Sequence, residues 1–259
     1  TDTLINLCSQ INVEPQKREL DIIMSCGEII SGTILVNMLK SRNIEATFLT
    51  GSQAGMITTS DFSNARINDI KTERKRKRLK NKKVVIIAGC QGATEDGEIT
   101  TLGRGGSDTS AVAIGKALEC DTVEIYTDVD GIMTADPRIE PEAKVLNCID
   151  YEEVFQMADK GAKVIHPRAV KLAKSANITL AIKNTLNPTF AGTRICSECK
   201  NEVIGYEQEE GLMTAVAHKD KIAQVKIKIS EDIFTEILNE IEKNSISIDM
   251  INFFIEEKV

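Results

Sequence analysis

Residues 100–108, with the sequence TTLGRGGSD, combine the residue types needed to bind a charged small molecule. Glycines just before a helix let the backbone approach a ligand, and the free N–H groups and dipole of the helix N-terminus favour an anion. Arg104 adds a forked donor for a carboxylate or phosphate, and Asp108 offers a partner for an ammonium group or a metal-bound water. We expect Ser107 or Asp108 to cap the helix. The alternative is a tight connection between a strand and a helix, with no ligand.

Two strand-like runs and one helix must position this loop. Residues 84–89 and Thr122–Thr127 are apolar and strand-like, and residues 109–119 place apolar side chains at helical spacing. Two such strands joined through a helix predict a parallel crossover unit, in which ligands bind beyond the carboxyl ends of the strands. We therefore expect residues 103–108 and residues 127–128 to lie at one edge of a parallel sheet.

The rest of the chain repeats these patterns and predicts an α/β fold. Helices are expected at residues 3–11, 16–42, 151–160, 168–175 and 231–243, and strands at residues 44–50, 178–182, 212–217, 223–229 and 246–255. For the long helix the pattern predicts a buried side made of large apolar residues, namely Leu20, Ile23, Ile30, Ile34, Met38 and Leu39.

Composition narrows the class of protein. Of the 259 residues, 42% are apolar, and the net charge of −7 gives no reason to expect a nucleic-acid partner. Seven scattered cysteines favour a reducing compartment over a disulfide framework. No uninterrupted apolar run reaches the roughly 18 residues of a membrane span, and no secretory signal opens the sequence. We expect a cytoplasmic protein with no membrane partner.

Five motifs together resemble a known family. TTLGRGGSD closely resembles the signature of aspartate kinases, the aspartokinase branch of the amino acid kinase family. Four more blocks are similar to that family in its order, from about residue 19 to residue 195: residues 51–55 (GSQAG), 126–131 (YTDVDG), 134–138 (TADPR) and 161–167 (GAKVIHP). The implied fold has a mostly parallel central sheet with helices on both faces.

The resemblance implies roles for individual residues on the substrate side. Arg104 holds a carboxylate of L-aspartate, and Glu28 and Asp108 bracket its ammonium group. Gly106 and Ser107 line the same pocket. From the residues alone, an exposed helix position is the better explanation of Glu28.

It also implies a nucleotide site for ATP with Mg²⁺. Thr127 and Asp128 meet the nucleotide, Met133 lies near its adenine or ribose, Arg138 reaches its phosphates, and Lys163 contacts the transferred group. Arg104, Asp108 and Lys163 are then the catalytic residues, and no residue is a metal ligand. The alternatives are an exposed helix-end lysine for Lys163 and a turn brace for Arg138.

The reaction implied is transfer of the ATP γ-phosphoryl to the side-chain carboxylate of aspartate, giving 4-phospho-L-aspartate, the first step toward lysine, threonine and methionine. Because a carboxylate is already a nucleophile, such a site needs cations and N–H donors rather than a general base. The alternatives are a non-catalytic regulatory or assembly chain and a related kinase with another acidic substrate.

The implied domains are a kinase domain over residues 1–200, a linker over 201–211 and a partial ACT regulatory domain over 212–259. They imply a homo-oligomer, a dimer or tetramer, with lysine or threonine as the possible effector. Ser230, Glu231 and Asp232 stand where the family's effector loop is expected.

The sequence departs from the aspartate kinase pattern at three places. The family's opening Lys-Phe/Tyr-Gly-Gly loop, which holds the ATP phosphates, is absent, so we expect a truncated chain of low activity. Cys90 and Met133 each stand where the family often has an aromatic residue.

Two motifs remain outside this scheme. The basic run at residues 71–83 predicts an exposed helix face rather than a nucleic-acid patch, because it carries no aromatic stacking partners. Cys196 and Cys199 form a Cys-x2-Cys pair, but a structural zinc needs four ligands and no second pair follows. We expect two incidental cysteines, with a site shared between subunits as the alternative.

Overall fold

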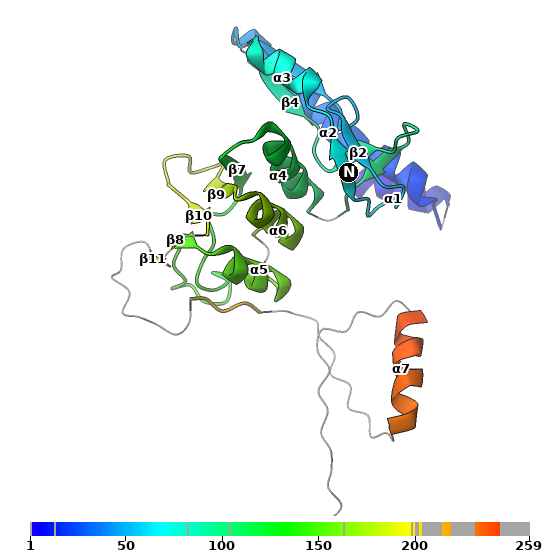
Figure 1. The fold of residues 1–259 in the computed structure, drawn as a ribbon, viewed down its shortest axis with the longest axis vertical. Coiled ribbons are helices and arrows are strands. Elements are labelled where there is room, and N and C mark those ends of the chain that lie inside the picture. Colours follow the sequence, from blue (N-terminus) through cyan, green and yellow to red (C-terminus); the bar gives the residue numbers. More distant parts are fainter. Residues whose placement is uncertain are drawn as a thin grey trace, which may run out of the picture. The chain divides into compact units, whose positions relative to one another are not determined.

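The computed structural model describes residues 2–12, 14–81, 83–103, 105–162, 164–197, 199, 202–203, 214–218 and 231–243. Contacts divide the chain into two compact units, Thr1–Lys219 and Asp220–Val259. Figure 1 shows the helices and strands of the first unit and helix α7 (Glu231–Lys243) of the second. The α/β class is confirmed.

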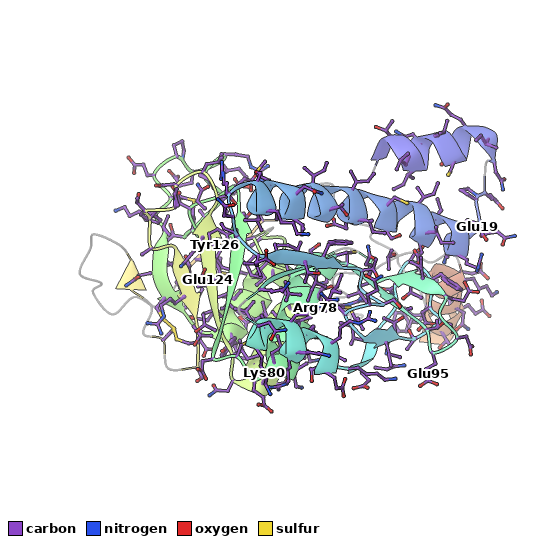
Figure 2. The ribbon with its side chains drawn as sticks, turned by 90° about the horizontal axis from the view of Figure 1, so that it is seen from above. Glu19, Arg78, Lys80, Glu95, Glu124 and Tyr126 are labelled. Carbon is purple, nitrogen blue, oxygen red and sulfur yellow. A yellow bond between two sulfur atoms is a disulfide. The ribbon has the colours of Figure 1, made fainter. Side chains whose placement is uncertain are left out.

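The first unit begins with two helices and a two-stranded parallel sheet. Helix α1 (Asp2–Ile11) precedes the long helix α2 (Lys17–Ser41), which packs against strands β1 (Ala46–Leu49) and β4 (Val84–Ile87). Helix α3 (Glu73–Lys80) lies on the other face of this sheet, where Arg78 donates to Thr47. Figure 2 shows α2 and α3 on opposite sides of β1. Here helices cover both faces, as the sequence predicts.

A four-stranded sheet of short strands lies beside α2, in the order β3-β2-β5-β6. Its strands are β2 (Met56–Thr58), β3 (Ile67–Ile70), β5 (Gln91–Ala93) and β6 (Ile99–Thr101). Only the β2–β5 pair is parallel. Residues 103–108 therefore follow the antiparallel hairpin β5–β6, which the sequence analysis did not predict. Strand β4 pairs with β1, and Thr122–Thr127 lies in a different sheet, so the parallel crossover unit that we expected from these two runs is wrong.

The third sheet has the order β11-β8-β10-β9-β7 and carries the main core. Its strands are β7 (Thr122–Thr127), β8 (Leu146–Ile149), β9 (Thr179–Asn184), β10 (Thr193–Ile195) and β11 (Glu202–Val203). Helices α4 (Gly106–Leu118), α5 (Tyr151–Asp159) and α6 (Pro167–Ala176) lie together on one of its faces, as Figure 1 shows. Their buried partners in the sheet include Leu146, Ile149, Leu180, Ile182 and Ile195.

Helix α2 buries a different side from the one its apolar residues predict. Its buried residues are Asp21, Ser25, Gly32 and Val36, whereas Ile30 and Ile34 are 58% and 60% exposed. The physical reason is close packing: a Cβ on Gly32 would lie 2.5 Å from the ring of Phe48, so only a small residue fits there.

The exposed apolar residues of α2 have a second consequence. Within the described residues, α2 is the one helix long and apolar enough to cross a membrane by length and composition. Asp21 and Glu28 interrupt its apolar residues, so α2 is not an uninterrupted apolar run of the kind that the sequence analysis considered. The same composition is found in core helices of soluble proteins, and α2 packs against β1, β4 and β6.

The basic run also departs from expectation at one position. Lys75 in α3 is fully buried, and its ammonium group donates to the carbonyl oxygens of Ala54 and Lys71. Burial lowers the pKa of Lys75. The helix is thus exposed on one side only, and Lys75 fastens it to the turn before β2.

Residues 214–218 belong to the first unit and are irregular rather than the strand we expected. The N–H of Val216 donates to the carbonyl of Thr134, and Thr214 donates to Glu153. In the second unit, α7 (Glu231–Lys243) matches its predicted bounds. The predicted strands at 223–229 and 246–255, and with them most of the ACT domain, lie outside the described residues.

Candidate active site

Helix α4 starts earlier than its sequence predicts. Its N-cap is Gly105, in the left-handed region at φ 68° and ψ 14°, and no side chain caps the helix. The expectation that Ser107 or Asp108 is the cap is therefore wrong, because both lie within the first turn. The N–H of Gly106 donates to the carbonyl of Gly103 at 3.1 Å, whereas the N–H groups of Ser107 and Asp108 have no partners within the helix and can face an anion.

Two glycines of the loop are required by close contacts. A Cβ on Gly105 would lie 2.1 Å from Cγ of His166, and a Cβ on Gly106 would lie 2.5 Å from Sγ of Cys90. The loop is thus held between the start of α6 and the residues that follow β4. Any larger residue at Gly105 would push His166 away and would also be strained by the positive φ.

Asp108 is held by the start of α6. Its Oδ2 accepts from the backbone N–H of His166 at 3.2 Å. Burial raises the pKa of Asp108, against the opposing effects of the hydrogen bond and charge of His166. Ser107 is exposed and lies next to Gly89, just beyond the carboxyl end of β4. A Cβ added to Gly89 would lie 3.3 Å from Oγ of Ser107.

Glu28 comes to the same loop from α2. It is exposed, although it lies on the face of the helix that buries Asp21, Ser25 and Gly32. Burial raises the pKa of the Cys90 thiol, and the negative charges of Glu28 and Asp21 raise it further. The charge of Glu28 therefore acts on Cys90.

Cys90 contacts the loop at residues 103–108. Its Sγ donates to the carbonyl of Gly103 at 3.4 Å. Gly106, Ser107 and Asp108 thus follow one another in the first turn of α4, next to Cys90, and a substrate site formed by them and Glu28 stays a prediction.

Two residues that the sequence analysis missed support this arrangement. Asp21 is fully buried and accepts four hydrogen bonds, two from the N–H and hydroxyl of Thr101 and two from those of Ser63. Arg168 donates to the carbonyl of Leu102 and to Asn64. Asp21 was detectable as a lone acid among apolar residues, seven positions before Glu28.

A third missed residue, His166, packs on Gly105 and caps α6, where its Nδ1 accepts from the N–H of Arg168. Burial, followed by the positive charge of Arg168, lowers the pKa of His166. A neutral ring suits both the packing and the cap. The signal for it was the His-Pro pair that opens the helix.

The residues predicted for the nucleotide lie at the carboxyl end of β7 and beyond it. Thr127 ends β7 and donates through its hydroxyl to Asp128, which is exposed. Met133 is half-buried and bridges to Val145. The side chain of Arg138 is 76% exposed. Its Nε donates to Oδ1 of Asp136 at 3.0 Å, and its Nη2 donates to Oδ2 at 2.6 Å.

The contact between Arg138 and Asp136 changes the pKa of Asp136. Hydrogen bonds from the side chain and backbone of Arg138 hold the pKa of Asp136 far below its usual range. This is the turn brace that the sequence left as an alternative. A role for Arg138 with phosphates stays a prediction.

Arg104 and Lys163 lie outside the described residues. Of the three residues predicted to be catalytic, the described part therefore includes only Asp108.

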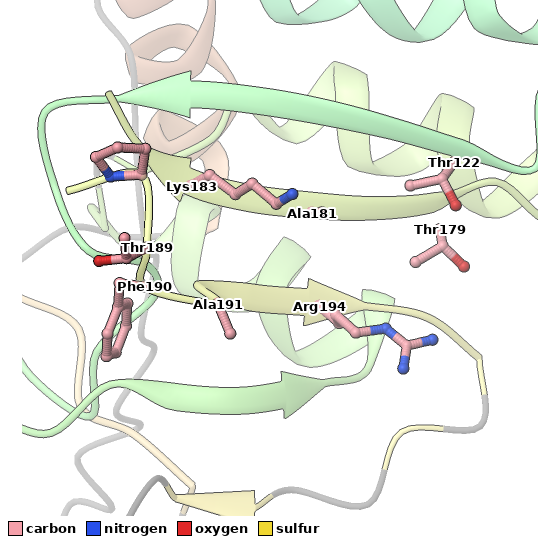
Figure 3. Close-up of a pocket in the computed structure, with 9 residues that line it drawn as sticks. Thr122, Thr179, Ala181, Lys183, Thr189, Phe190, Ala191 and Arg194 are labelled. Atoms are coloured by element: carbon pink, nitrogen blue, oxygen red, sulfur yellow. The ribbon is translucent and has the colours of Figure 1, made fainter. Parts of the chain in front are cut away.

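A hollow of 490 Å³ lies elsewhere, on the face of the third sheet away from the core side chains (Figure 3). Lys183 and Arg194 contribute its charges, and Thr122, Thr179 and Phe190 also line it. Lys183 pairs with Glu124, and hydrogen bonding between them lowers the pKa of Glu124 and raises that of Lys183. None of the predicted site residues lines this hollow.

Comparisons with known proteins bear on the whole arrangement. Aspartokinase 1 from Bacillus subtilis (strain 168) is 40% identical over 255 residues, which are 97% of this chain and 63% of that protein. Two crystal structures of E. coli aspartokinase III are also similar. The R-state, in complex with aspartate and ADP, has a TM-score of 0.77 at 28% identity, covering 98% of this chain and 57% of that chain. The T-state, in complex with lysine and aspartate, has a TM-score of 0.64 at 32% identity, covering 77% of this chain and 46% of that chain.

The chain thus spans about 60% of the length of the curated relatives it matches. A family model, that of the amino acid kinase family, matches residues 1–184. With more than half of its length matched, this chain belongs to the amino acid kinase family.

Proposed function

We propose that this chain is part of an aspartate kinase, which transfers the γ-phosphoryl of ATP to the β-carboxylate of L-aspartate and yields 4-phospho-L-aspartate. The observation that carries the proposal is the glycine loop at the N-terminus of α4, where Asp108 lies in the first turn and Gly106 packs against Cys90, on which the charge of Glu28 acts. A helix N-terminus beside two acids suits a ligand that carries both a carboxylate and an ammonium group.

The chain's residues would orient the substrate rather than activate it. Glu28 and Asp108 would take the ammonium group. The first-turn N–H of Ser107 would take a carboxylate together with Arg104, and Gly106, whose N–H donates to Gly103, would line the same pocket. This leaves the second carboxylate free to attack phosphorus. Since that carboxylate is already ionised at neutral pH, alignment is the main task of the protein.

The nucleotide would lie toward the carboxyl end of β7. Thr127, Asp128 and Met133 would contact it, and Arg138 and Lys163 would approach its phosphates. The exposed carboxylate of Asp128 fits the preference of Mg²⁺ for oxygen ligands, with the phosphates as its main partners. Bound there, Mg²⁺ would neutralise charge on the transferring group.

The remaining assignments are also proposals. We place the enzyme in the cytoplasm, as a dimer or tetramer, with the domain borders expected from the sequence. Lysine or threonine is the proposed effector, and the lysine complex of the similar E. coli enzyme supports lysine.

A hydroxamate assay tests the activity. The chain, and the same chain within its natural full-length protein, are incubated with ATP, Mg²⁺ and L-aspartate, and hydroxylamine traps the acyl phosphate. We expect aspartyl hydroxamate from aspartate, and no substrate-dependent release of ADP when glutamate, UMP or carbamate replaces aspartate. Product with one of those substrates would assign a different kinase of the same family. Aspartate binding without any product would favour the regulatory alternative.

A pair of variants tests the site within that assay. Glu28→Gln removes one proposed ammonium partner and is expected to raise the KM for aspartate at least tenfold, with the KM for ATP unchanged. Glu95→Gln, an exposed acid in the turn between β5 and β6 (Figure 2), is the control. Equal kinetics for the two variants would remove Glu28 from the site.

A further inference from the structure

Three cysteines from separate parts of the sequence meet at one end of the third sheet. Cys148 lies in β8, Cys196 directly follows β10, and Cys199 precedes β11. Their three sulfur atoms all lie within 4.8 Å of one another, and each side chain is half-buried. Within the described ranges this is the one group of side chains that meets the geometric needs of a metal ion.

The strand order explains how they meet. Strand β8 lies between β10 on one side and β11 on the other, so the segment that joins β10 to β11 must cross β8. The N–H of Cys196 donates to the carbonyl of Ile149 at 3.3 Å and anchors the start of the crossing. The crossing leaves the Cα atom of Cys199 5.5 Å from that of Cys148 and 5.6 Å from that of Cys196.

Disulfide chemistry cannot satisfy all three sulfurs. Sγ of Cys199 lies at bonding distance from the sulfur of Cys148 and from that of Cys196, but a disulfide sulfur has only one sulfur partner. Any disulfide here would leave a third thiol against it. A metal ion at the centre of the three sulfurs uses all of them at once.

Of the three distances between the sulfurs, the one between Cys148 and Cys196 is near that of a metal site. The sulfurs of Cys148 and Cys196 are 3.5 Å apart. In a tetrahedral zinc site with Zn–S bonds of about 2.3 Å, neighbouring sulfurs are about 3.8 Å apart. The Cys-x2-Cys spacing of Cys196 and Cys199 is also typical of one half of a zinc site.

We propose that Cys148, Cys196 and Cys199 bind one Zn²⁺ as thiolates, with a water molecule as the fourth ligand. Binding converts three thiols into three thiolates and releases three protons, so affinity increases with pH. Zinc keeps its oxidation state, and no electron is transferred. The water completes the tetrahedron because, in the described part of the chain, no further histidine, cysteine or carboxylate joins the group.

The position gives the ion a structural role. It would fasten the segment that leaves β10 across the end of β8, where the chain passes toward the second unit. Zinc that binds only the folded state adds its binding free energy to stability. This site is separate from the loop at residues 103–108 and does not depend on the proposed kinase activity.

Metal content tests the proposal directly. The full chain is expressed with zinc, purified and dialysed under reducing conditions, and its zinc is measured by mass spectrometry. We expect one zinc per chain in the native protein and none in Cys148→Ser. The matched control is Cys120→Ser, which changes an exposed cysteine outside the group and should keep one zinc.

A second measurement works even if Cys148→Ser does not fold. Cobalt is titrated into the metal-free native chain, where thiolate-to-cobalt charge-transfer bands and the visible bands of a tetrahedral centre should saturate at one equivalent. Alkylation should spare Cys148, Cys196 and Cys199 while zinc is bound and label all three after chelation. Equal labelling of these three thiols with and without chelation, or a metal-free chain that forms a disulfide within the group instead of binding cobalt, would overturn the proposal.

Discussion

The backbone N–H of His166 donates to Oδ2 of Asp108 at 3.2 Å, which joins the start of α6 to the first turn of α4. The two residues are 58 positions apart in sequence. Because the donor is a backbone group, the contact orients the carboxylate without neutralising it. The carboxylate therefore keeps its charge for a ligand, at a helix end whose dipole also favours an anion.

Asp108→Asn should weaken aspartate use and leave the fold intact. The amide oxygen can still accept from His166, but the negative charge for the ammonium group is lost. We expect the KM for aspartate to rise roughly 10- to 100-fold, because a hydrogen bond to a charged group contributes about 1.5–3 kcal/mol. The control is Asp150→Asn, since Asp150 caps α5 and asparagine caps a helix equally well.

The pH dependence of binding gives a second readout of the same variant. Burial raises the pKa of Asp108, so the native carboxyl takes up its proton at a higher pH than an ordinary aspartate. Protonation removes the charge, and aspartate binding should weaken as the pH falls through that raised pKa. Calorimetry across this range should show a smaller pH dependence in Asp108→Asn. An unchanged profile would assign the titration to another group.

Gly105→Ala should destabilise the protein more than Gly97→Ala. Both glycines have a positive φ, 68° and 90°, so both substitutions carry backbone strain. At Gly97 nothing lies within 4 Å of an added Cβ, whereas at Gly105 it meets the ring of His166. We expect a loss of about 1–2 kcal/mol at Gly97 and roughly 2 kcal/mol more at Gly105, measured by urea unfolding. Equal losses would mean that His166 moves aside freely.

Sequence patterns predict elements whose burial follows their apolar periodicity. Strand β7 and helix α7 have their predicted bounds because their apolar residues alternate or repeat as the sequence suggests. The hairpin β5–β6 was missed because its strands have three residues each and carry glycine and threonine. The buried side of α2 was misassigned because Gly32 and Asp21, rather than its isoleucines, face the strands.

The sequence predicts which side chains form the candidate site but not the contacts that hold them. Motif residues such as Asp108 and Glu28 carry their chemistry in the sequence, but the groups that hold them do not. The hydrogen bond from His166 to Asp108 comes from a backbone N–H, and every residue except proline has such a group, so the residue type does not predict it. The partner of Cys196 and Cys199 was missed because Cys148 is separated from Cys199 by 51 positions and reaches it only through strand pairing.

Asp21→Ala should be among the more destabilising substitutions in the chain. It leaves the N–H groups of Ser63 and Thr101 without their acceptor in the interior, and each unsatisfied group costs about 1–3 kcal/mol. We expect a loss of roughly 3 kcal/mol or more in urea unfolding, and a smaller loss for Asp21→Asn, which keeps one acceptor oxygen. Asp69→Ala, at an exposed acid of β3, should change stability by less than about 0.5 kcal/mol. A small effect of Asp21→Ala would show that water replaces the carboxylate.

Lys75→Met should change how stability depends on pH. Burial lowers the pKa of Lys75, so between that pKa and about 10.4 the unfolded chain binds more protons than the folded one. Stability from this group therefore rises with pH across the window, as linkage requires. In Lys75→Met this rise should disappear, whereas Lys77→Met, at an exposed lysine of the same helix, should keep it. Urea unfolding at several alkaline pH values measures the slope. A slope unchanged in Lys75→Met would mean that Lys75 keeps its ordinary proton affinity inside the fold, with its charge held by the carbonyls of Ala54 and Lys71.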